Sequence, residues 1–551
     1  MVPTDVQTRD IDPPSIDGVV RTDSTTRQLY STDASIYELE PEFVFFPFNK
    51  ADVKTIHEWS AETDVSIIPR GAGTSLSGQS IGQGAVVDYS RHINDIIDRD
   101  PDSETVTVEP GVVLEHLNDF LAQYDRQFGP DVATANRATI GGMIGNNSAG
   151  AHSIRYGYTA QHVESITTVL PGGEKVTFEP ISMEEASRKA KQKGPVGRLY
   201  DKIPEFIRSN STEIETMYPD LLRNVSGYGL DRFLEKLQDD VVDFTELICG
   251  SEGTLGAVVE AELSTVPAID EKNLIVVNCD SLRSAVSVNR RVVEESPLAI
   301  ELLDRTLLEL AEDSLEISRY MDWLTGDPEA ILIVEVGSEV DGPSLQKRVE
   351  TIRRAIDSAN ESTSVSVVRD PEQQQNVWKV RKSGLPLLLG ISDDRKPTTF
   401  VEDTAVDPSR LAGYVRDFQD IVEDYNTTAA FYGHISVGCL HIRPLINLKS
   451  ASGVSDMKEM TGEIVELVKE YNGALSGEHG DGRSRSEWLD DFYGEPLVSV
   501  FNQVKETFDP DRRFSPGNIV EPQSMTENLR FGADYEVQEW DIQQDFSEQG
   551  G

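Results

Sequence analysis

The order of apolar and polar residues in the first half of the chain predicts short strands alternating with helices. Residues 66–68 and 85–88 are apolar runs bounded by turn-forming residues, a pattern typical of buried strands. Asn49 is placed to cap a helix that runs to about residue 63. Residues 105–108 alternate polar and apolar side chains, which predicts a half-buried strand. The segment after it places five large side chains on one helical face: Leu114, Leu117, Phe120, Leu121 and Tyr124.

After about residue 268 the pattern changes to longer helical segments. We predict helices over 302–315 and 407–425, with strands such as 331–334 between them. This alternation indicates a second lobe built from helices and strands. Residues 471–520 then return to charged, glycine-rich motifs, and the residues from 521 onward are polar and acidic. Together the two lobes predict an α+β protein.

Charge narrows the range of functions. The chain holds 50 Lys and Arg against 96 Asp and Glu, a formal net charge of −46. Such a surface excludes binding to the phosphate backbone of nucleic acids, and an anionic membrane repels it. The acidic residues are spread along the chain and Lys is scarce, which favours a salt-adapted (halophilic) protein over an ordinary, very soluble acidic one. Because residues 1–18 show no signal pattern and no apolar run reaches about 18 residues, we expect a cytoplasmic location.

Three glycine-rich segments interrupt the first half of the chain: 69–78 (PRGAGTSLSG), 138–150 (ATIGGMIGNNSAG) and 249–256 (CGSEGTLG). Their small residues let backbone N–H groups approach and surround an anion. The first segment is not a Rossmann turn, because Leu76 stands where the third glycine is needed and residues 71–84 hold too many Gly and Ser to begin a helix. No GK[ST] follows, so a P-loop is excluded as well. One such segment could be a tight turn, but three within about 180 residues favour a ligand cradle.

Histidines and a carboxylate in the last third of the chain predict a metal site. His434 and His441 are seven residues apart, and a chain reversal at Gly438 could aim both at one point. With Glu478 they make two imidazoles and a carboxylate, the pattern of an open divalent-metal site. The alternative is two ordinary strand histidines and a helix-capping glutamate. The cysteines are too far apart in sequence for thiolate sites or a disulfide framework: Cys249, Cys279 and Cys439.

In their order and spacing, PRGAGTSLSG, ATIGGMIGNNSAG and GSEGTLG resemble the FAD-binding domain of the vanillyl-alcohol oxidase / p-cresol methylhydroxylase superfamily. They are similar above all to its branch of D-lactate, glycolate and D-2-hydroxyglutarate dehydrogenases. The resemblance implies a p-cresol methylhydroxylase-type, two-lobed FAD-binding domain, then an α+β substrate (cap) domain and a small C-terminal segment of helices and loops. Some members of this superfamily attach the flavin covalently through a His in the first segment, but no His lies between residues 58 and 91, so the resemblance implies non-covalent FAD. The residues that the resemblance implies for FAD are Arg70, Gly71, Ala72, Gly73, Thr74, Ser75, Gly142, Asn147, Ser148, Gly150, Glu252, Gly253 and Asn518.

The second half carries further motifs that resemble the same branch. GHISVGCLH and GEHG imply a Zn²⁺ or Mn²⁺ site at His434, His441 and Glu478, followed by a catalytic base, His479. WKVR, and the lysine before FVED, imply that Arg381 and Lys396 hold a substrate carboxylate, a task for which a guanidinium offers two parallel donors.

Two positions differ from the family pattern. Arg443 stands near the place where other members have Asn, so we expect different substrate contacts there. Residues 508–518 resemble the family's closing FDPxxxxNPGK segment, but Asn518 takes the place of the usual Lys.

The resemblance covers about residues 30–522 and implies an FAD-dependent dehydrogenase that oxidises a D-lactate-like D-2-hydroxyacid to the 2-oxoacid. In this hypothesis the metal polarises the 2-hydroxyl, His479 takes its proton, and a hydride passes from C2 to flavin N5. We divide the chain accordingly into an N-terminal lead (1–40), an FAD-binding domain (41–268), a cap domain (269–470), a C-terminal FAD and active-site segment (471–522) and an acidic tail (523–551).

Reoxidation of the flavin implies an external electron acceptor, either an iron–sulfur protein or a quinone-linked carrier. The ending DFSEQGG resembles a segment from which longer fused proteins continue into an iron–sulfur module. The alternatives are a flavoprotein oxidase that uses O2, a flavin-dependent transferase like the alkyl-dihydroxyacetonephosphate synthases, and a non-enzymatic FAD-binding scaffold. A homodimer is left open.

Overall fold

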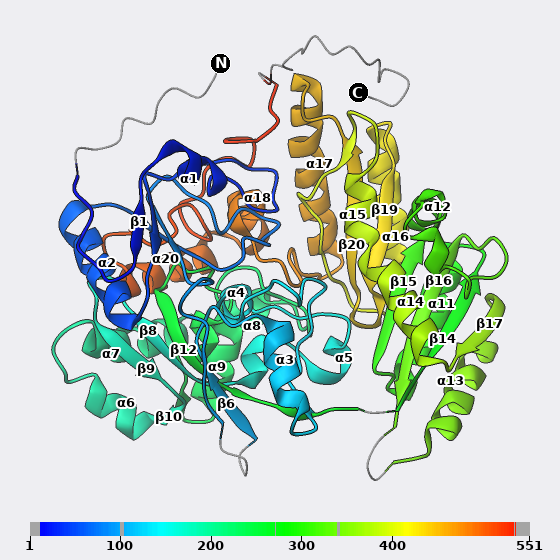
Figure 1. The fold of residues 1–551 in the computed structure, drawn as a ribbon, viewed down its shortest axis with the longest axis horizontal. Helices are drawn as coiled ribbons and strands as arrows, with labels where there is room; N and C mark the ends of the chain where they lie inside the picture. The colour runs from blue at the N-terminus through cyan, green and yellow to red at the C-terminus, as the bar shows by residue number, and fades with distance from the viewer. Residues whose placement is uncertain (1–10, 100–103, 270, 339–341, 534, 536–551) are drawn as a thin grey trace.

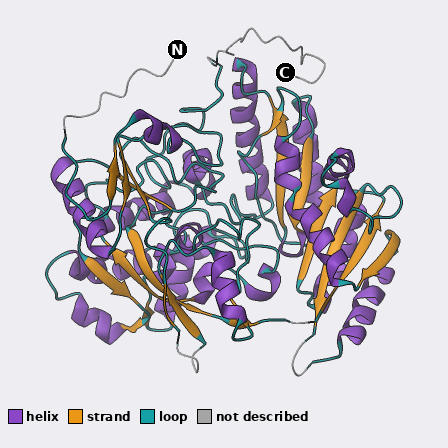
Figure 2. Ribbon diagram, viewed as in Figure 1, coloured by secondary structure: helices purple, strands orange, loops and turns teal. Residues whose placement is uncertain are grey.

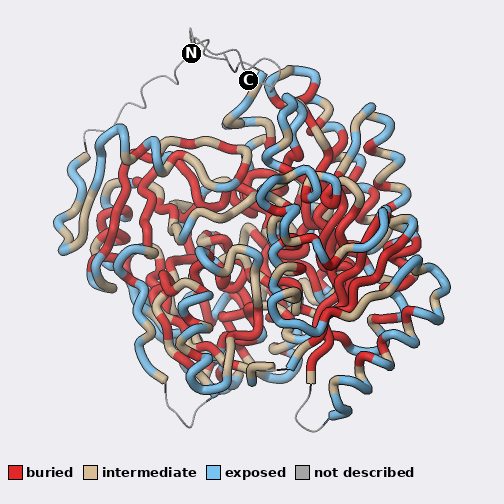
Figure 3. The backbone as a smooth tube through the Cα atoms, turned by 45° about the vertical axis from the view of Figure 1, so that its right-hand side comes forward, coloured by how far each residue is buried: buried red, intermediate tan, exposed pale blue. Residues whose placement is uncertain are grey.

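The computed structural model describes residues 11–99, 104–269, 271–338, 342–533 and 535, and it places them in two lobes that lie side by side (Figure 1). The first lobe contains two main sheets and the second one large sheet, each covered by helices (Figure 2). The buried residues follow the strands of both lobes and the segments between them (Figure 3). This is the α+β architecture that the hydrophobic pattern predicts.

The first sheet of the first lobe brings one glycine-rich loop to its edge. Strands β2 and β3 both pair parallel with β4, and the loop 69–78 leaves the sheet at the end of β3. Helix α2 (Lys50–Thr63) begins after Asn49, whose side chain accepts two backbone N–H bonds, so the predicted cap is confirmed. In sheet order the strands are β1 (Val19–Arg21), β2 (Phe43–Phe46), β4 (Ala85–Asp88) and β3 (Ile67–Arg70).

The N-terminal lead contains regular secondary structure. Its described part forms β1 and helix α1 (Ser24–Leu29), and β1 pairs antiparallel with β2. The apolar strand β2 is fully buried and needs a neighbour on that side, which Val19 and Val20 supply. Residues 1–10 of the lead, and residues 536–551 of the acidic tail with DFSEQGG, lie outside the described residues.

The second sheet of the first lobe is antiparallel and carries most of the hydrophobic core. Its strands in order are β5 (Ile96–Asp98), β6 (Thr105–Val108), β12 (Ala257–Ser264), β8 (Val163–Val169) and β9 (Lys175–Phe178). Small two-stranded sheets pair β7 (Arg126–Gln127) with β13 (Val266–Pro267), and β10 (Ile181–Ser182) with β11 (Val241–Val242). The helices of this part are α3 (Leu114–Ala122), α4 (Ile140–Asn146), α5 (Ser153–Tyr156), α6 (Met183–Lys189), α7 (Pro195–Ser209), α8 (Ser211–Met217), α9 (Leu230–Gln238) and α10 (Thr245–Ile248).

The C-terminal segment returns to the first lobe after the second lobe is complete. Its helices are α18 (Gly482–Arg485), α19 (Leu489–Tyr493) and α20 (Glu495–Phe508). Phe501 and Phe508 of α20 join the same core cluster as Phe178 and Phe244. This return carries the motif GEHG from the second lobe back to the glycine-rich loops.

The second lobe is built on one antiparallel sheet of seven strands. In sheet order these are β17 (Ser362–Val368), β14 (Lys272–Cys279), β16 (Ala330–Gly337), β15 (Ala299–Asp304), β19 (Ala429–His434), β20 (Cys439–Ile446) and β18 (Lys396–Pro397). Its helices are α11 (Leu282–Val292), α12 (Arg305–Asp313), α13 (Leu345–Ala359), α14 (Pro371–Lys382), α15 (Gly384–Leu389), α16 (Leu411–Asp424) and α17 (Ala451–Glu470).

Alternation along the strands divides these helices between the two faces of the sheet. Ile275 and Val277 of β14 face the cluster that includes α11, α13, α16 and α17, whereas Leu274 and Val276 face α12 and α14. The strands are therefore apolar on both faces, which explains their nearly continuous hydrophobic runs. No helix among the described residues is long and apolar enough to cross a lipid bilayer.

Three element predictions are corrected by the structure. The helix predicted over 302–315 is wrong at its start, because residues up to Asp304 belong to the buried strand β15 and Asp304 caps α12. The helix predicted over 407–425 begins only at Leu411. The second glycine-rich segment is not all loop: residues Ile140–Asn146 form α4, capped by Thr139.

Candidate active site

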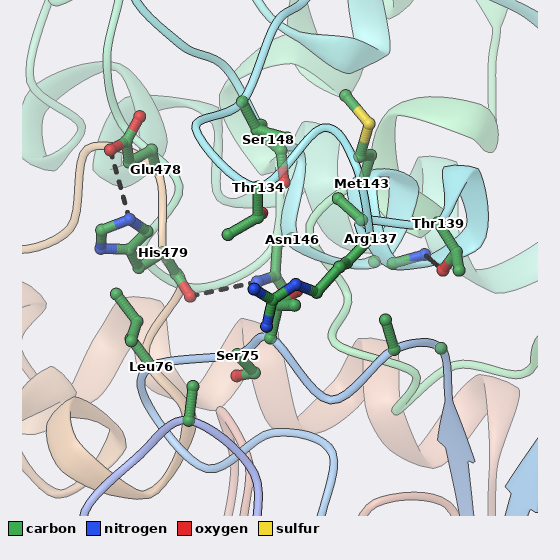
Figure 4. Close-up of a pocket in the computed structure, with 18 of the residues that line it drawn as sticks. Ser75, Leu76, Thr134, Arg137, Thr139, Met143, Asn146, Ser148, Glu478 and His479 are labelled. Atoms are coloured by element: carbon green, nitrogen blue, oxygen red, sulfur yellow. Dashed lines mark hydrogen bonds and ion pairs between the residues drawn. The ribbon is translucent and has the colours of Figure 1, made fainter. Parts of the chain in front are cut away.

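A cavity of about 790 Å³ lies where the two lobes meet, and its walls contain the three glycine-rich segments and the histidine cluster. Figure 4 shows part of its lining, from Ser75 to His479. Its volume falls in the range of small-molecule and cofactor sites, about 300–1,000 Å³. The predicted site residues that line it are Arg70, Gly71, Ala72, Gly73, Thr74, Ser75, Gly142, Ser148, Gly150, Glu252, Gly253, Arg381, His434, His441, Glu478 and His479. Three predicted residues are not in its wall: Asn147, Lys396 and Asn518.

The loop 69–78 has the form of an anion cradle. Among the described residues, the backbone N–H groups of residues 72–76 have no hydrogen-bond acceptor, although these residues line the cavity. A Cβ at Gly71 would lie 2.2 Å from Thr139 Oγ1, and Gly73 has φ of +67°. Consecutive N–H groups that line a cavity without a protein partner are available to a ligand that accepts hydrogen bonds. The loop therefore fits the phosphates of a dinucleotide such as FAD.

Arg70 supports this cradle from behind. Its guanidinium donates to the backbone carbonyls of Tyr30, Thr32 and Ser80 at 2.9–3.3 Å. Burial lowers the pKa of Arg70, with nearby carboxylates opposing the shift. Arg70 lines the cavity, as predicted, and these hydrogen bonds hold the loop in shape.

The second segment presents Asn146, not the predicted Asn147, to the cavity. Asn147 adopts a left-handed conformation at the end of α4, and its side-chain oxygen accepts the N–H of Ala160 at 2.8 Å. Asn146 lines the cavity, and its Nδ2 donates to the carbonyl oxygen of His479 at 3.3 Å (Figure 4). Gln79, the residue after the first segment, donates to the same carbonyl. The backbone of His479 is thus held from the second segment and from the end of the first.

The third segment fixes the turn that follows His479. The buried carboxylate of Glu252 accepts the N–H groups of Asp481, at 2.6 Å, and of Gly482, at 3.0 Å. Burial, together with the nearby charge of Asp481, raises the pKa of Glu252 to about 8. Asn518, predicted to contact the cofactor, lies outside the cavity wall, and its Nδ2 donates to the Gln79 carbonyl at 3.3 Å.

The hairpin of β19 and β20 brings His434 and His441 to one face of the sheet. His434 pairs with Cys439 and Tyr432 pairs with His441, so both imidazoles project from the same side. The chain reverses through residues 435–438, where Gly438 has φ of +70°. The predicted reversal at Gly438 is therefore confirmed.

Glu478 lies at the centre of the imidazole cluster. Its Oε2 is 3.4 Å from His434 Nε2, and its Oε1 is 3.2 Å from both His441 Nε2 and His479 Nε2. One ligand atom from each of His434, His441 and Glu478 can be chosen so that all three lie within 4.8 Å of one another. Two imidazoles and a carboxylate converging in a cavity form a donor set that fits Zn²⁺ or Mn²⁺ with a position left for substrate.

Buried charges around this cluster set the state of its imidazoles. Burial disfavours charge on His434, but the carboxylates of Glu301 and Glu478 outweigh it and raise its pKa to about 9. Burial lowers the pKa of His441 to about 3, so its ring is neutral. Burial opposes the charged form of Glu478, but His434 and Arg223 hold its pKa well below the usual range.

Three buried carboxylates that sequence reasoning did not assign hold the cluster in place. Glu301 Oε1 lies 2.7 Å from His434 Nδ1, and Glu402 Oε2 lies 2.6 Å from His479 Nδ1. Asp403 Oδ2 accepts the N–H groups of Glu478, at 2.8 Å, and of His479, at 2.7 Å. A carboxylate on the far nitrogen of a metal-binding imidazole fixes its tautomer and orientation. The acidic pair 402–403 inside an apolar run was the one available signal for two of them.

The two residues predicted to hold a substrate carboxylate lie in different places. Arg381 lines the cavity, with its Nε 2.7 Å and its Nη2 2.6 Å from the carboxylate of Glu301. Lys396 is exposed on the edge strand β18 and donates to the carbonyl of Ile391, outside the cavity wall.

Two protein-family models match the chain: an FAD binding domain over residues 41–179, and the C-terminal domain of FAD linked oxidases over residues 270–519. The chain is 33% identical over 522 residues to the D-2-hydroxyglutarate dehydrogenase of Escherichia coli (strain K12), covering 92% of this chain and 51% of that protein. It is 27% identical to the glycolate oxidase subunit GlcD of Bacillus subtilis (strain 168), covering 90% of this chain and 92% of that one. The chain thus spans about half the length of the D-2-hydroxyglutarate dehydrogenases that it matches.

Solved structures share the fold at low sequence identity. A 4-ethylphenol oxidase from Gulosibacter chungangensis has a TM-score of 0.64 at 13% identity, over 92% of this chain and 94% of that one. An alkyldihydroxyacetonephosphate synthase has a TM-score of 0.61 at 17% identity, over 90% of this chain and 82% of that one. The predicted two-lobed FAD-binding fold is therefore confirmed. With its FAD-binding domain and its oxidase C-terminal domain, the chain belongs to the FAD-linked oxidase family, and it is similar to the D-2-hydroxyglutarate, glycolate and D-lactate dehydrogenases.

Proposed function

We propose that this chain is an FAD-dependent dehydrogenase that oxidises a D-2-hydroxyacid to the corresponding 2-oxoacid. The observation that carries the proposal is a single cavity whose wall contains both the phosphate cradle 72–76 and the cluster of His434, His441, Glu478 and His479. The chemistry that FAD supplies when bound is acceptance of a hydride from C2 of the substrate. The relatives named as D-2-hydroxyglutarate, glycolate and D-lactate dehydrogenases support this reaction class.

In this proposal His479 removes the proton of the 2-hydroxyl group. The carboxylate of Glu402 lies 2.6 Å from His479 Nδ1 and so holds the side of the ring opposite to Nε2, the nitrogen that would accept the proton. His479 Nε2 faces the cluster, 3.2 Å from Glu478 Oε1. His434, His441 and Glu478 would hold Zn²⁺ or Mn²⁺, which would supply Lewis-acid polarisation of the hydroxyl oxygen.

Arg381 is suited to hold the carboxylate next to C2. Its guanidinium is buried in the cavity wall and is oriented by Glu301, which also contacts His434. Glu301 therefore ties the position of the substrate carboxylate to that of the metal ligand. A planar guanidinium can bind a carboxylate through parallel donors, which an ammonium group does poorly.

For the substrate we propose a D-2-hydroxyacid with a second carboxylate, as in D-2-hydroxyglutarate, over the D-lactate-like acid that we first expected. Arg443 lines the cavity, is 1% exposed, and pairs with Glu402 through Nη2 only. Its Nε and Nη1 have no hydrogen-bond partner among the described residues. Arg381 and Arg443 lie 5.2 and 5.7 Å from the centroid of the same ring, that of Tyr432, so two guanidinium groups border one substrate space.

The test is a dye-reduction screen without oxygen, at high salt, over the D and L forms of 2-hydroxyglutarate and lactate. We expect D-2-hydroxyglutarate to be oxidised fastest, with electrons passing to an added iron–sulfur or quinone-like acceptor. His479→Ala should retain bound FAD but lose turnover by roughly 10²–10⁴-fold, the usual contribution of a general base. His116→Ala, on the exposed side of α3, is the matched control.

Other outcomes would replace this proposal. Unchanged turnover in His479→Ala would remove His479 from the chemistry. Stoichiometric peroxide under air would indicate an oxidase, and flavin chemistry without net oxidation would indicate a transferase.

A further inference from the structure

Among the arginines of the first lobe that line the cavity, Arg137 is the one whose guanidinium pairs with no described residue. Arg70 and Arg137 are the arginines of this lobe that line the cavity, and the donors of Arg70 are engaged by three backbone carbonyls. The guanidinium of Arg137 makes no hydrogen bond or ion pair with any described residue. In the second lobe, the buried arginines Arg381 and Arg443 are paired with Glu301 and Glu402.

The position of Arg137 places this free charge beside the phosphate cradle. Arg137 is two residues before Thr139, and Thr139 contacts the cradle so closely that a Cβ at Gly71 would lie 2.2 Å from its Oγ1. Figure 4 shows the Arg137 side chain directed into the cavity, toward Ser75 and Asn146. The guanidinium therefore lines the same cavity as the loop whose N–H groups at 72–76 have no acceptor.

A cation beside the cradle would offset the negative charge of the FAD diphosphate. The diphosphate of FAD carries about two negative charges, whereas backbone N–H groups offer only partial positive charges. The chain has a formal net charge of −46, so its overall field opposes an anionic cofactor. A guanidinium can pair with phosphate oxygens through parallel, charge-assisted hydrogen bonds.

We propose that Arg137 binds the diphosphate of FAD, on the side of the phosphates that the cradle 72–76 leaves open. Arg137 then makes affinity for the cofactor depend on a single charge, separate from the residues that act on the substrate. A side chain that is exposed before FAD binds also gives the diphosphate a cation to meet on entry.

The test measures flavin affinity in the apo-protein, with no need for turnover. FAD and riboflavin, which lacks phosphate, are titrated by flavin fluorescence into wild type, Arg137→Gln and Arg137→Lys. We expect the Kd of FAD to rise roughly 10- to 100-fold in Arg137→Gln, the usual effect of losing a hydrogen bond between charged groups, and less in Arg137→Lys. The Kd of riboflavin should stay the same. Arg188→Gln, which removes an exposed charge from α6 of the same lobe, should change neither.

Two results would overturn the proposal. One is an FAD Kd in Arg137→Gln within about twofold of wild type. The other is an equal loss of FAD and riboflavin affinity, which would indicate a damaged cavity and not a lost phosphate contact. Thermal unfolding of each apo-protein distinguishes a folding defect from either result.

Discussion

Replacing His152 with Gln should weaken the contact between the two lobes in a pH-dependent way. His152 belongs to the first lobe, and its imidazole lies between two carboxylates: Nδ1 is 2.9 Å from Asp131 Oδ2, and Nε2 is 2.9 Å from Glu335 Oε1. Glu335 belongs to the second lobe and also accepts the indole N–H of Trp378 at 3.0 Å. Trp378 precedes Arg381 by three residues on α14, so this contact also positions the helix that carries Arg381.

The expected loss of folding stability can be worked out from the raised pKa of His152. Burial opposes the charged ring, but Asp131 and Glu335 outweigh it and raise the pKa of His152 from 6.5 to about 10. At about 1.4 kcal/mol per pH unit this displacement corresponds to about 5 kcal/mol, and breaking a buried ion pair typically costs about 3–5 kcal/mol. Because the pKa is raised on folding, this stabilisation is complete below about pH 6.5 and is lost as the pH rises toward 10. Glu335, whose pKa is lowered to about 2 mainly by His152 against the effect of burial, stays charged throughout that window.

The assay is thermal unfolding of wild type and His152→Gln between pH 6 and 10.5. We expect a clear loss of stability in the variant at pH 6.5 that shrinks steadily toward pH 10. His116→Gln, an exposed histidine on α3, is the control and should match wild type at every pH. A difference between His152→Gln and wild type that does not vary with pH would refute the reasoning, because it would mean that the charge of the ring contributes nothing.

Two further predictions concern the cluster in the cavity. Glu301→Gln should lower Zn²⁺ affinity by roughly 10- to 100-fold, because His434 loses the carboxylate that orients its ring. Competition with a chromophoric chelator measures this, with the exposed Glu309→Gln as control, and equal affinities would contradict the metal assignment. Arg443→Gln should lower kcat/KM for D-2-hydroxyglutarate by roughly 10- to 100-fold and spare D-lactate, because only the former offers a second carboxylate. An equal loss on both acids would show that Arg443 supports the site without binding substrate.

The sequence is informative where a function depends on a short, continuous segment. The cradle 69–78 and the reversal at Gly438 are local properties, set by small residues and by backbone conformations that glycine adopts easily. The same local reasoning fails by one residue at Asn147. There the left-handed end of α4 turns Asn147 toward Ala160 and leaves Asn146 facing the cavity, and nothing in the spacing of the motif distinguishes the two.

Residues that act through partners far along the chain are harder to predict. Lys396 precedes an apolar run and was expected at the substrate, but it lies on an edge strand whose ends are set by β20. In the sequence, Asp403 only marked the end of the FVED motif and was given no role. In the structure its carboxylate accepts the N–H groups of residues 478 and 479, about 75 positions away. Its partners become evident only when the C-terminal segment has returned to the first lobe.

One feature of the sequence could have predicted that some of these buried carboxylates have charged partners. Glu301 and Glu335 each lie inside a fully buried strand between apolar residues, and β15 and β16 are neighbours in the sheet. An unpaired carboxylate in such a place would cost several kcal/mol, so each requires a cation or several donors from elsewhere in the fold. In the structure each contacts an imidazole: Glu301 that of His434 and Glu335 that of His152. A glutamate between apolar residues of a strand therefore predicts a charged partner from the sequence alone. The fold decides which residue that partner is, and hence whether the glutamate supports the metal cluster or the contact between the lobes.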